Sequence, residues 1–229
     1  KAELARWYRA AFDRYEATLP EPASFRDEAQ AASWRRTREA SRFLADHLAE
    51  ARRDDPLPLF LCCGGPLTNV AEALRHAPDI AQRMTLIWIG GGGYPDGGWE
   101  YNLATDVAAA RHVIENSTVP LWQVPQPAYR QMQLSIAEMT ADMRPVSAFT
   151  EWLYDQFTHP PSFVKLGGAW PMGDSPPVLL TAVATESSSF TDQAARRILA
   201  DLRYGDAVPG RSLRVYHTID VRLTHADFL

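Results

Sequence analysis

Three short apolar runs, spaced by segments with helical periodicity, constrain the fold of this chain more than any other feature. The runs cover Leu57–Cys62, Met84–Ile89 and Val119–Val124. Continuous apolar runs of this length are typical of parallel strands that are buried on both faces. Between the runs, Thr68–His76 and Thr105–Asn116 carry apolar residues at helical spacing. Strands that alternate with helices predict an α/β fold with an open, mainly parallel sheet flanked by helices.

The two ends of the chain add further elements to this unit. Residues 2–17 and 28–53 have helical periodicity, and residues 130–157 are interpreted as two helices. Apolar stretches on either side of Gly205–Gly210 predict a C-terminal β-ribbon that turns at these glycines. A short helix over Thr224–Leu229 is expected to close the chain.

The end of the first strand carries a glycine-rich segment, Gly64–Asn69, with the sequence Gly-Gly-Pro-Leu-Thr-Asn. In open α/β sheets, ligands bind outside the carboxyl ends of the strands. Glycines let the backbone approach a ligand closely, and exposed carbonyl groups there can bind a cation. The alternative interpretation is a tight strand-to-helix turn in which Thr68 or Asn69 caps the following helix.

The end of the second strand carries four glycines, Gly90–Gly93, followed after a short loop by Glu100 and Asn102. These glycines are expected to carry the chain away from the sheet and over a pocket. If the loop is extended, residues two apart point the same way, so Glu100 and Asn102 would present a carboxylate and an amide together. Such a pair suits the neighbouring hydroxyls of a sugar. Alternatively, Asn102 caps a helix and Glu100 is solvated.

A third candidate lies in the proline-bounded segment Trp170–Ser175, which contains Asp174. This carboxylate precedes an apolar segment, Val178–Ala184, which could be a helix or a strand. Asp174 could cap a helix there, or it could be a metal ligand supplied from a distant part of the chain.

Composition and motif content exclude several classes of function. The net charge is -5 and no basic stripe is present, which disfavours nucleic acid as a partner. No apolar run is long enough to span a membrane, and no histidine lies in a metal-binding pattern such as His-Glu-x-x-His. Gly90–Gly93 lacks the setting of a dinucleotide fingerprint, which disfavours an oxidoreductase.

Adjacent Cys62 and Cys63 form no disulfide framework, so we expect a reducing, cytoplasmic location. Residues 1–229 are long enough for a single domain.

Together these segments resemble the inosine–uridine-preferring nucleoside hydrolase family, whose members cleave the N-glycosidic bond of ribonucleosides. The segments that carry the resemblance are Gly65–Ala71, Ala77–Ile80, Ile87–Gly92, Glu100–Asn102, Asp106 with Ala108 and Ala109, and, more loosely, Val208–Arg211, Ile219–Asp220 and Phe228–Leu229. The resemblance implies the nucleoside-hydrolase-like sheet. The long helical N-terminal segment and the sequence Gly173-Asp174-Ser175-Pro176 resemble a divergent branch of the family, which has cellulose-binding members, more than the other branches.

The resemblance also implies roles for individual residues. Glu100 and Asn102 match the residues that hold the ribose hydroxyls, and Asp174 matches an aspartate that ligates a catalytic calcium ion. Gly64 takes the position whose main-chain carbonyl reaches the same ion. Calcium would orient a water molecule for attack on the anomeric carbon of the ribose. The implied partners are a small-molecule nucleoside or sugar and further copies of the chain in a homo-oligomer.

This chain departs from the family's pattern in two places. The family usually has a histidine before the aspartate matched by Asp174, and here that position is Gly173. The family also begins with a strand that ends in Asp-x-Asp-x-x-x-Asp-Asp, the source of the general base and of most calcium ligands. The sequence contains no such cluster, and Asp54-Asp55 precedes a strand instead of following one. We therefore assign no catalytic base in this chain. Because Lys1 opens directly on a helical segment, we expect a fragment or a processed chain.

Two functions remain open from the sequence. The first is a calcium-dependent N-ribohydrolase that needs the absent N-terminal segment. The second is a relative that binds nucleosides or carbohydrates without catalysis.

Overall fold

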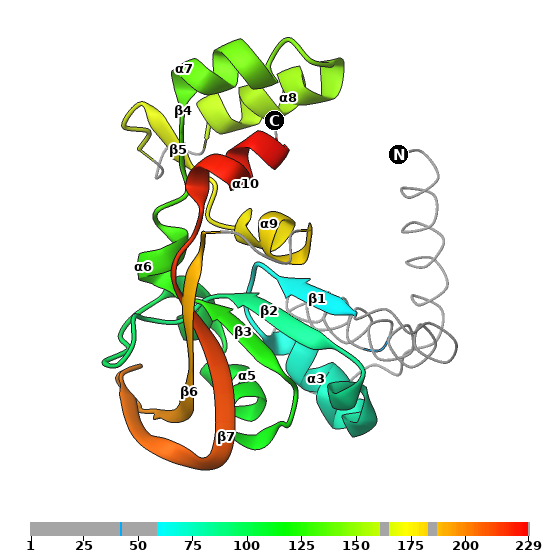
Figure 1. Ribbon diagram of the computed structural model, residues 1–229, viewed down its shortest axis with the longest axis vertical. Helices are drawn as coiled ribbons and strands as arrows, with labels where there is room; N and C mark the ends of the chain where they lie inside the picture. Colours follow the sequence, from blue (N-terminus) through cyan, green and yellow to red (C-terminus); the bar gives the residue numbers. More distant parts are fainter. Residues whose placement is uncertain (1–41, 43–58, 161–164, 183–186, 229) are drawn as a thin grey trace, which may run out of the picture.

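The structure, a computed structural model, describes residues 42, 59–160, 165–182 and 187–228. Its main sheet has the strand order β1-β2-β3-β7-β6 (Figure 1). The strands are β1 (Phe60–Cys63), β2 (Thr85–Ile89), β3 (Leu121–Val124), β6 (Ser189–Ile198) and β7 (Tyr204–Thr218). Strands β1, β2, β3 and β7 run parallel, and β6 pairs with β7 in the antiparallel sense. The predicted fold class is therefore confirmed.

Helices connect the parallel strands as the sequence predicts. After β1 come α3 (Thr68–His76) and the 3₁₀ helix η1 (Pro78–Gln82). After β2 come α4 (Tyr101–Thr105), α5 (Val107–Arg111) and the π-helical turn η2 (His112–Asn116). The helices predicted over residues 2–17 and 28–53 lie almost entirely outside the described residues.

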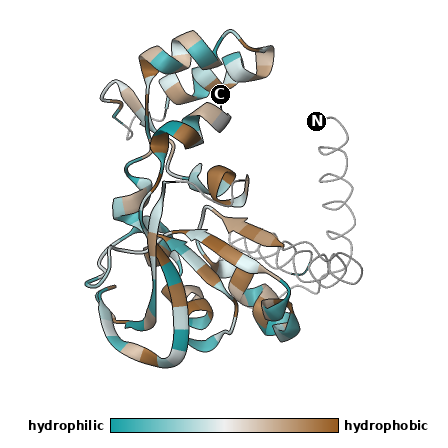
Figure 2. Cartoon of the chain, in the orientation of Figure 1, coloured by the Kyte–Doolittle hydropathy of each residue, from teal (hydrophilic) through white to brown (hydrophobic). Residues whose placement is uncertain are grey.

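The sheet buries apolar side chains on both faces, as a continuous apolar strand requires. In β2, Leu86 and Trp88 pack into a core beneath α3 and α5, whereas Ile87 and Ile89 point into a second core on the other face. In Figure 1, α3 and α5 cover one face of the sheet, while α9 lies over the other. Figure 2 shows hydrophobic residues along the central strands.

The second core extends into a layer built mainly from residues 126–182. This layer contains α6 (Gln126–Tyr129), β4 (Gln133–Ser135), α7 (Ile136–Glu138), η3 (Met139–Met143), α8 (Ala148–Thr158), β5 (Ala169–Pro171) and α9 (Pro176–Ala182). The expected two helices are present, with their break near Pro145. The short strand β4 was not predicted; it forms because it pairs with β5, which is distant in sequence.

The C-terminal ribbon is present, but its turn lies elsewhere than predicted. The chain reverses at residues 199–203, where the Leu199 N–H donates to the Arg203 carbonyl at 2.8 Å. Gly205–Gly210 lies inside β7, in a part of the ribbon whose register shifts twice. Such bulges accommodate glycine within a strand, so glycine was a misleading turn signal here.

The last helix also starts earlier than predicted. Helix α10 covers Val221–Phe228, because the Asp220 carboxylate accepts from the Leu223 N–H at 2.8 Å and caps its first turn.

Candidate functional site

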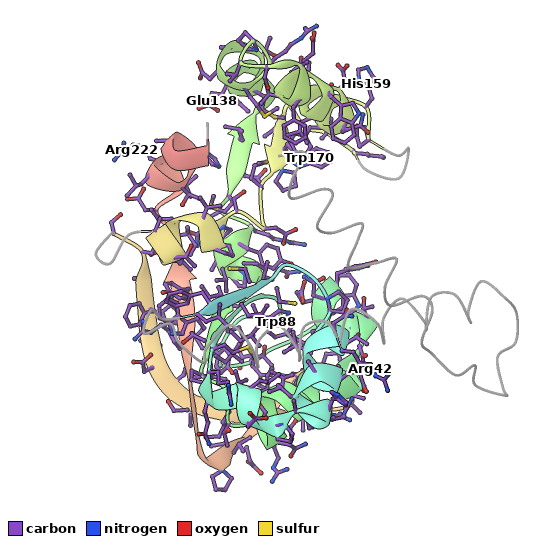
Figure 3. The ribbon with its side chains drawn as sticks, turned by 90° about the vertical axis from the view of Figure 1, so that its right-hand side faces the viewer. Arg42, Trp88, Glu138, His159, Trp170 and Arg222 are labelled. Carbon is purple, nitrogen blue, oxygen red and sulfur yellow. The ribbon has the colours of Figure 1, made fainter. Side chains whose placement is uncertain are left out.

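The exit of β1 is a loop that presents the Gly64 backbone to solvent. The Trp88 indole N–H, on the neighbouring strand, donates to the Gly65 carbonyl at 3.0 Å and fixes this loop. Trp88 is labelled in Figure 3. The predicted alternative, capping of α3 by Thr68 or Asn69, is wrong. Leu67 takes the N-cap position without a side-chain cap, and the Thr68 hydroxyl donates instead to Asp106 at 2.7 Å.

The exit of β2 depends on Gly91, whose φ of +85° lies in the region that favours glycine. A Cβ atom at this position would lie 2.3 Å from the Gln123 amide nitrogen and 2.5 Å from the Tyr204 hydroxyl. The Gly91 N–H donates to the Glu100 carboxylate at 2.8 Å. This glycine therefore lets the backbone pass close to the sheet and turns its N–H toward the carboxylate.

Glu100 is buried, with 1% of its surface exposed, so it is not a solvated side chain. It is the N-cap residue of α4 and accepts from the N–H groups of Asn102 at 3.1 Å and Leu103 at 2.9 Å. The Tyr129 hydroxyl donates to the same carboxylate at 3.0 Å. The expectation that Glu100 and Asn102 lie in one extended loop is wrong. The Glu100 side chain accepts from the backbone N–H groups at the start of α4, so the helix begins at Tyr101 and includes Asn102.

Asn102 joins the exits of the first two strands. Its side-chain amide nitrogen donates to the Gly64 carbonyl at 3.2 Å and to the Ile89 carbonyl at 2.8 Å. The amide oxygen accepts no hydrogen bond from a described residue. Asn102 therefore offers one acceptor atom next to the Gly64 backbone.

Asp174 lies against this backbone, although it is 110 positions further along the chain (174 − 64). A Cβ atom built on Gly64 would lie 3.1 Å from the Asp174 carboxyl carbon and 3.1 Å from one of its oxygens. Partial desolvation, and then the charge of Glu100, raise the pKa of Asp174. No described N–H of α9 donates to Asp174, so the capping alternative finds no support in that helix. The fold thus brings Gly64, Asn102 and Asp174 together, with Glu100 beneath them.

Tyr129 belongs to the same site but was not predicted from the sequence. It ends α6, directly after β3, and its ring lies beside Gly173; a Cβ there would lie 3.1 Å from the ring. Burial, and then the charge and hydrogen bond of Glu100, raise the pKa of Tyr129 to about 12. The phenol is therefore a hydrogen-bond donor at neutral pH. Its place after a third strand exit was the one available signal, and it is a weak one.

The described residues do not by themselves make a calcium site. Calcium takes about six to eight oxygen ligands, and this point offers the Asp174 carboxylate and the Gly64 carbonyl. No cluster of three or more His, Cys, Asp or Glu side chains suited to a metal occurs in residues 59–160, 165–182 or 187–228. Further ligands would have to come from outside this part of the chain.

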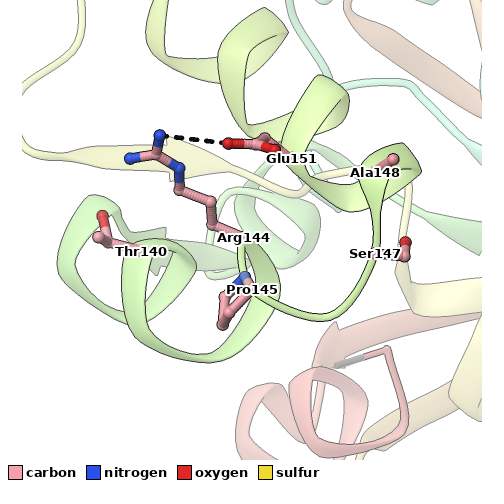
Figure 4. Close-up of a pocket in the computed structure, with 6 residues that line it drawn as sticks. All are labelled: Thr140, Arg144, Pro145, Ser147, Ala148 and Glu151. Atoms are coloured by element: carbon pink, nitrogen blue, oxygen red, sulfur yellow. Dashed lines mark hydrogen bonds and ion pairs between the residues drawn. The ribbon is translucent and has the colours of Figure 1, made fainter.

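A separate hollow lies on the helical layer and not at the strand exits. It is lined by Thr140, Arg144, Pro145, Ser147, Ala148 and Glu151 (Figure 4). An ion pair of 3.3 Å joins Arg144 to Glu151 across it, and both side chains are exposed. Because these residues lie on η3, α8 and the connection between them, the hollow is not part of the site around Asp174.

Comparison with known proteins identifies the family. The family model described as inosine-uridine preferring nucleoside hydrolase matches residues 12–222. The chain belongs to this family. The match extends from the N-terminal segment to α10, so the resemblance expected from the sequence motifs is confirmed.

Curated relatives align with only a part of this chain. An uncharacterized protein of Schizosaccharomyces pombe is 32% identical over 133 residues, which is 55% of this chain and 39% of the relative. The pyrimidine-specific ribonucleoside hydrolase RihA of Salmonella arizonae is 30% identical over 117 residues, 48% of this chain and 37% of the relative. The matched regions thus cover less than two-fifths of the length of these relatives.

Solved structures share the fold. A plant nucleoside hydrolase, PpNRh1, superposes with a TM-score of 0.63 at 21% identity, covering 82% of this family member and 64% of the plant chain. An inosine-guanosine nucleoside hydrolase has a TM-score of 0.62 at 18% identity, covering 82% and 65%. Within the described part of the family member, no helix has the length and apolar character needed to cross a membrane.

Proposed function

We propose that this chain carries the ribose-binding part of a nucleoside N-ribohydrolase, which cleaves the bond between ribose and base. The observation that supports this most strongly is the approach of Asp174 to Gly64, beside Asn102 and above the buried Glu100. These four residues come from three separate parts of the sequence. They are also the residues that the resemblance assigns to the sugar and the metal.

In this proposal, the acceptors available to ribose hydroxyls are the amide oxygen of Asn102 and the carboxylate of Asp174. Glu100 contributes mainly as a fixed negative charge, because four protein donors already surround its carboxylate. Cleavage of a glycosidic bond passes through a positively charged, oxocarbenium-like sugar. Fixed negative charge close to that sugar lowers the energy of the transition state.

Calcium and the catalytic base are the incomplete parts of the proposal. Asp174 and the Gly64 carbonyl would be two of the ligands, and the other oxygens would come from outside the described residues. The base that activates water is not assigned to any residue of this chain. The proposed substrates are ribonucleosides, and no preference among nucleobases is assigned.

The test measures hydrolysis of inosine, uridine and p-nitrophenyl riboside, with and without calcium, together with calorimetric binding of the same compounds. We expect the 229-residue chain to bind ribosides but to release no base, because it lacks the acidic cluster. Asp174→Asn is expected to weaken binding about 10- to 100-fold, as for loss of a hydrogen bond to a charged group. Asp142→Asn, on the exposed surface of η3, is the matched control.

Two results would contradict the proposal in different ways. Turnover by the 229-residue chain would show that the acidic cluster is dispensable. Equal affinity in wild type and Asp174→Asn would show that the ribose site lies elsewhere.

The alternative is a nucleoside- or carbohydrate-binding protein without catalysis. The finding that favours it is that the described residues contain no group of three or more His, Cys, Asp or Glu side chains that could hold a metal ion. Riboside binding without turnover, even when the longest natural form of the protein is assayed with calcium, would support this alternative.

A further inference from the structure

The site consists of two halves that come from different layers of the fold. The sheet half contains Gly64, Glu100 and Asn102, at the exits of β1 and β2. The turn half contains Gly173 and Asp174, between β5 and α9. Tyr129 contacts both halves: its hydroxyl donates to Glu100 at 3.0 Å, and its ring lies against Gly173.

On the sheet half, the Tyr129 hydroxyl supplies the side-chain hydrogen bond to the Glu100 carboxylate. A carboxylate has about four acceptor directions, and Glu100 receives four donors. Three of these donors are backbone N–H groups, of Gly91, Asn102 and Leu103. The Tyr129 hydroxyl is the fourth, and it is the side-chain donor among them. A hydrogen bond to a buried carboxylate is strong, so this bond holds the ring in a defined place.

On the turn half, the segment that contains Tyr129 also holds the segment that leads to Asp174. Strand β4 pairs with β5 through Leu134 and Trp170, and the Met172 N–H donates to the Met132 carbonyl at 2.7 Å. The ladder ends there, one residue before Gly173. The next residue along the chain, Gly173, lies beside the Tyr129 ring, and Asp174 directly follows Gly173.

We propose that Tyr129 is a positioning residue, which couples the buried Glu100 to the Gly173–Asp174 turn and so sets the place of the Asp174 carboxylate beside Gly64. A Cβ at position 173 would lie 3.1 Å from the ring, so a side chain there would require the ring to move by a few tenths of an ångström. The consequence for ligand affinity rests on the proposed function, whereas the consequence for the turn does not.

The test uses two variants and a matched control in the 229-residue chain. Tyr129→Phe removes the hydroxyl and keeps the ring, and Tyr129→Leu removes both. The control is Tyr154→Phe, which removes the hydroxyl that accepts from Thr140 at 3.1 Å on the helical layer. The ligand-independent readout is amide hydrogen exchange of Ser175, whose N–H donates to the Met172 carbonyl within the turn at 3.0 Å. The Ala109 N–H, which donates to Asp106 at 2.9 Å, is the internal reference.

We expect Tyr129→Phe to speed exchange of Ser175 about tenfold, as for loss of one hydrogen bond to a charged group, with Ala109 unchanged. Tyr129→Leu should speed it further, and Tyr154→Phe should have no effect. The affinity for inosine and uridine, measured by calorimetry, should fall about tenfold in Tyr129→Phe.

Each other outcome decides a separate point. Unchanged exchange of Ser175 in both Tyr129 variants would overturn the inference, and so would an equal rise at Ala109, which would indicate general loss of stability. Faster exchange with full affinity would overturn the role in the site. Selective exchange in a protein whose wild type binds no riboside would support positioning by Tyr129 and overturn the proposed function.

Discussion

At the scale of single residues, the four glycines after β2 are needed for different physical reasons. Gly91 needs a positive φ, whereas a Cβ at Gly92 would lie 2.4 Å from the Gly97 carbonyl carbon. At Gly90 the obstacle is the Trp88 indole, 2.3 Å from a Cβ, and at Gly93 it is the Pro127 ring, 2.9 Å away. The run of glycines thus lets a loop fold back closely over the sheet while Gly91 donates to Glu100.

We predict that Gly91→Ala lowers the free energy of unfolding by about 2–4 kcal/mol, from the left-handed backbone strain and the clash with Gln123. Chemical denaturation measures this change. The control is Gly167→Ala, an exposed position with no atom within 4 Å of a new Cβ. A loss at Gly91 no larger than at Gly167 would contradict this account of the loop.

At the scale of elements, Asp106 connects two helices on the same face of the sheet. Its carboxylate caps α5 by accepting from the Ala109 N–H at 2.9 Å, and it accepts from the Thr68 hydroxyl of α3 at 2.7 Å. Because α3 follows the exit of β1, and α5 follows the exit of β2 after α4, this residue links the segments that follow the two exits.

Asp106→Ala is expected to cost about 1–2 kcal/mol of stability, the usual value for a lost helix cap. The measurement is thermal or chemical unfolding, with Asp142→Ala as a control on an exposed carboxylate. An Asp106→Ala variant as stable as the control would show that neither hydrogen bond matters in solution.

The ribbon of β6 and β7 carries a cross-strand ion pair that depends on pH. Asp192 lies opposite Arg214, and the two side chains approach to 3.0 Å. The hydrogen bond from Arg214 lowers the pKa of Asp192 below its ordinary value. A lowered pKa in the folded state means that this pair stabilises the protein above the pKa of the unfolded chain, and that the stabilisation is lost as pH falls through the folded value.

We therefore predict that Asp192→Asn lowers the melting temperature near neutral pH and that the difference from wild type shrinks below about pH 4. Melting curves across this range measure it. Asp206→Asn, an exposed aspartate on the same ribbon, should show no such trend. A difference that grows toward low pH would have the wrong sign for this interaction.

At the scale of the whole molecule, the site depends on three chain segments that meet at one end of the sheet. Gly64 follows β1, Glu100 and Asn102 follow β2, and Asp174 arrives from the layer above. The first two segments could be expected to meet, since parallel strands end at the same edge. The approach of Asp174 depends on the pairing of β4 with β5, which has no local signal in the sequence.

The sequence by itself determined the alternation of strands and helices from β1 to β3, because buried parallel strands are continuous apolar runs and amphipathic helices repeat every 3.6 residues. It also pointed to Gly64, Glu100, Asn102 and Asp174, through a resemblance to the family to which the chain belongs. Only the tertiary structure decided that Glu100 is a buried helix cap, that the ribbon turns at residues 199–203, and that Tyr129 joins the two halves of the site. The cap and the turn are closed by local hydrogen bonds, but the spacing of Glu100 and Asn102 and the glycines of Gly205–Gly210 fitted other interpretations equally well. The contacts of Tyr129 with Glu100 and Gly173 join residues far apart in the chain, and such contacts leave no periodic pattern in the sequence.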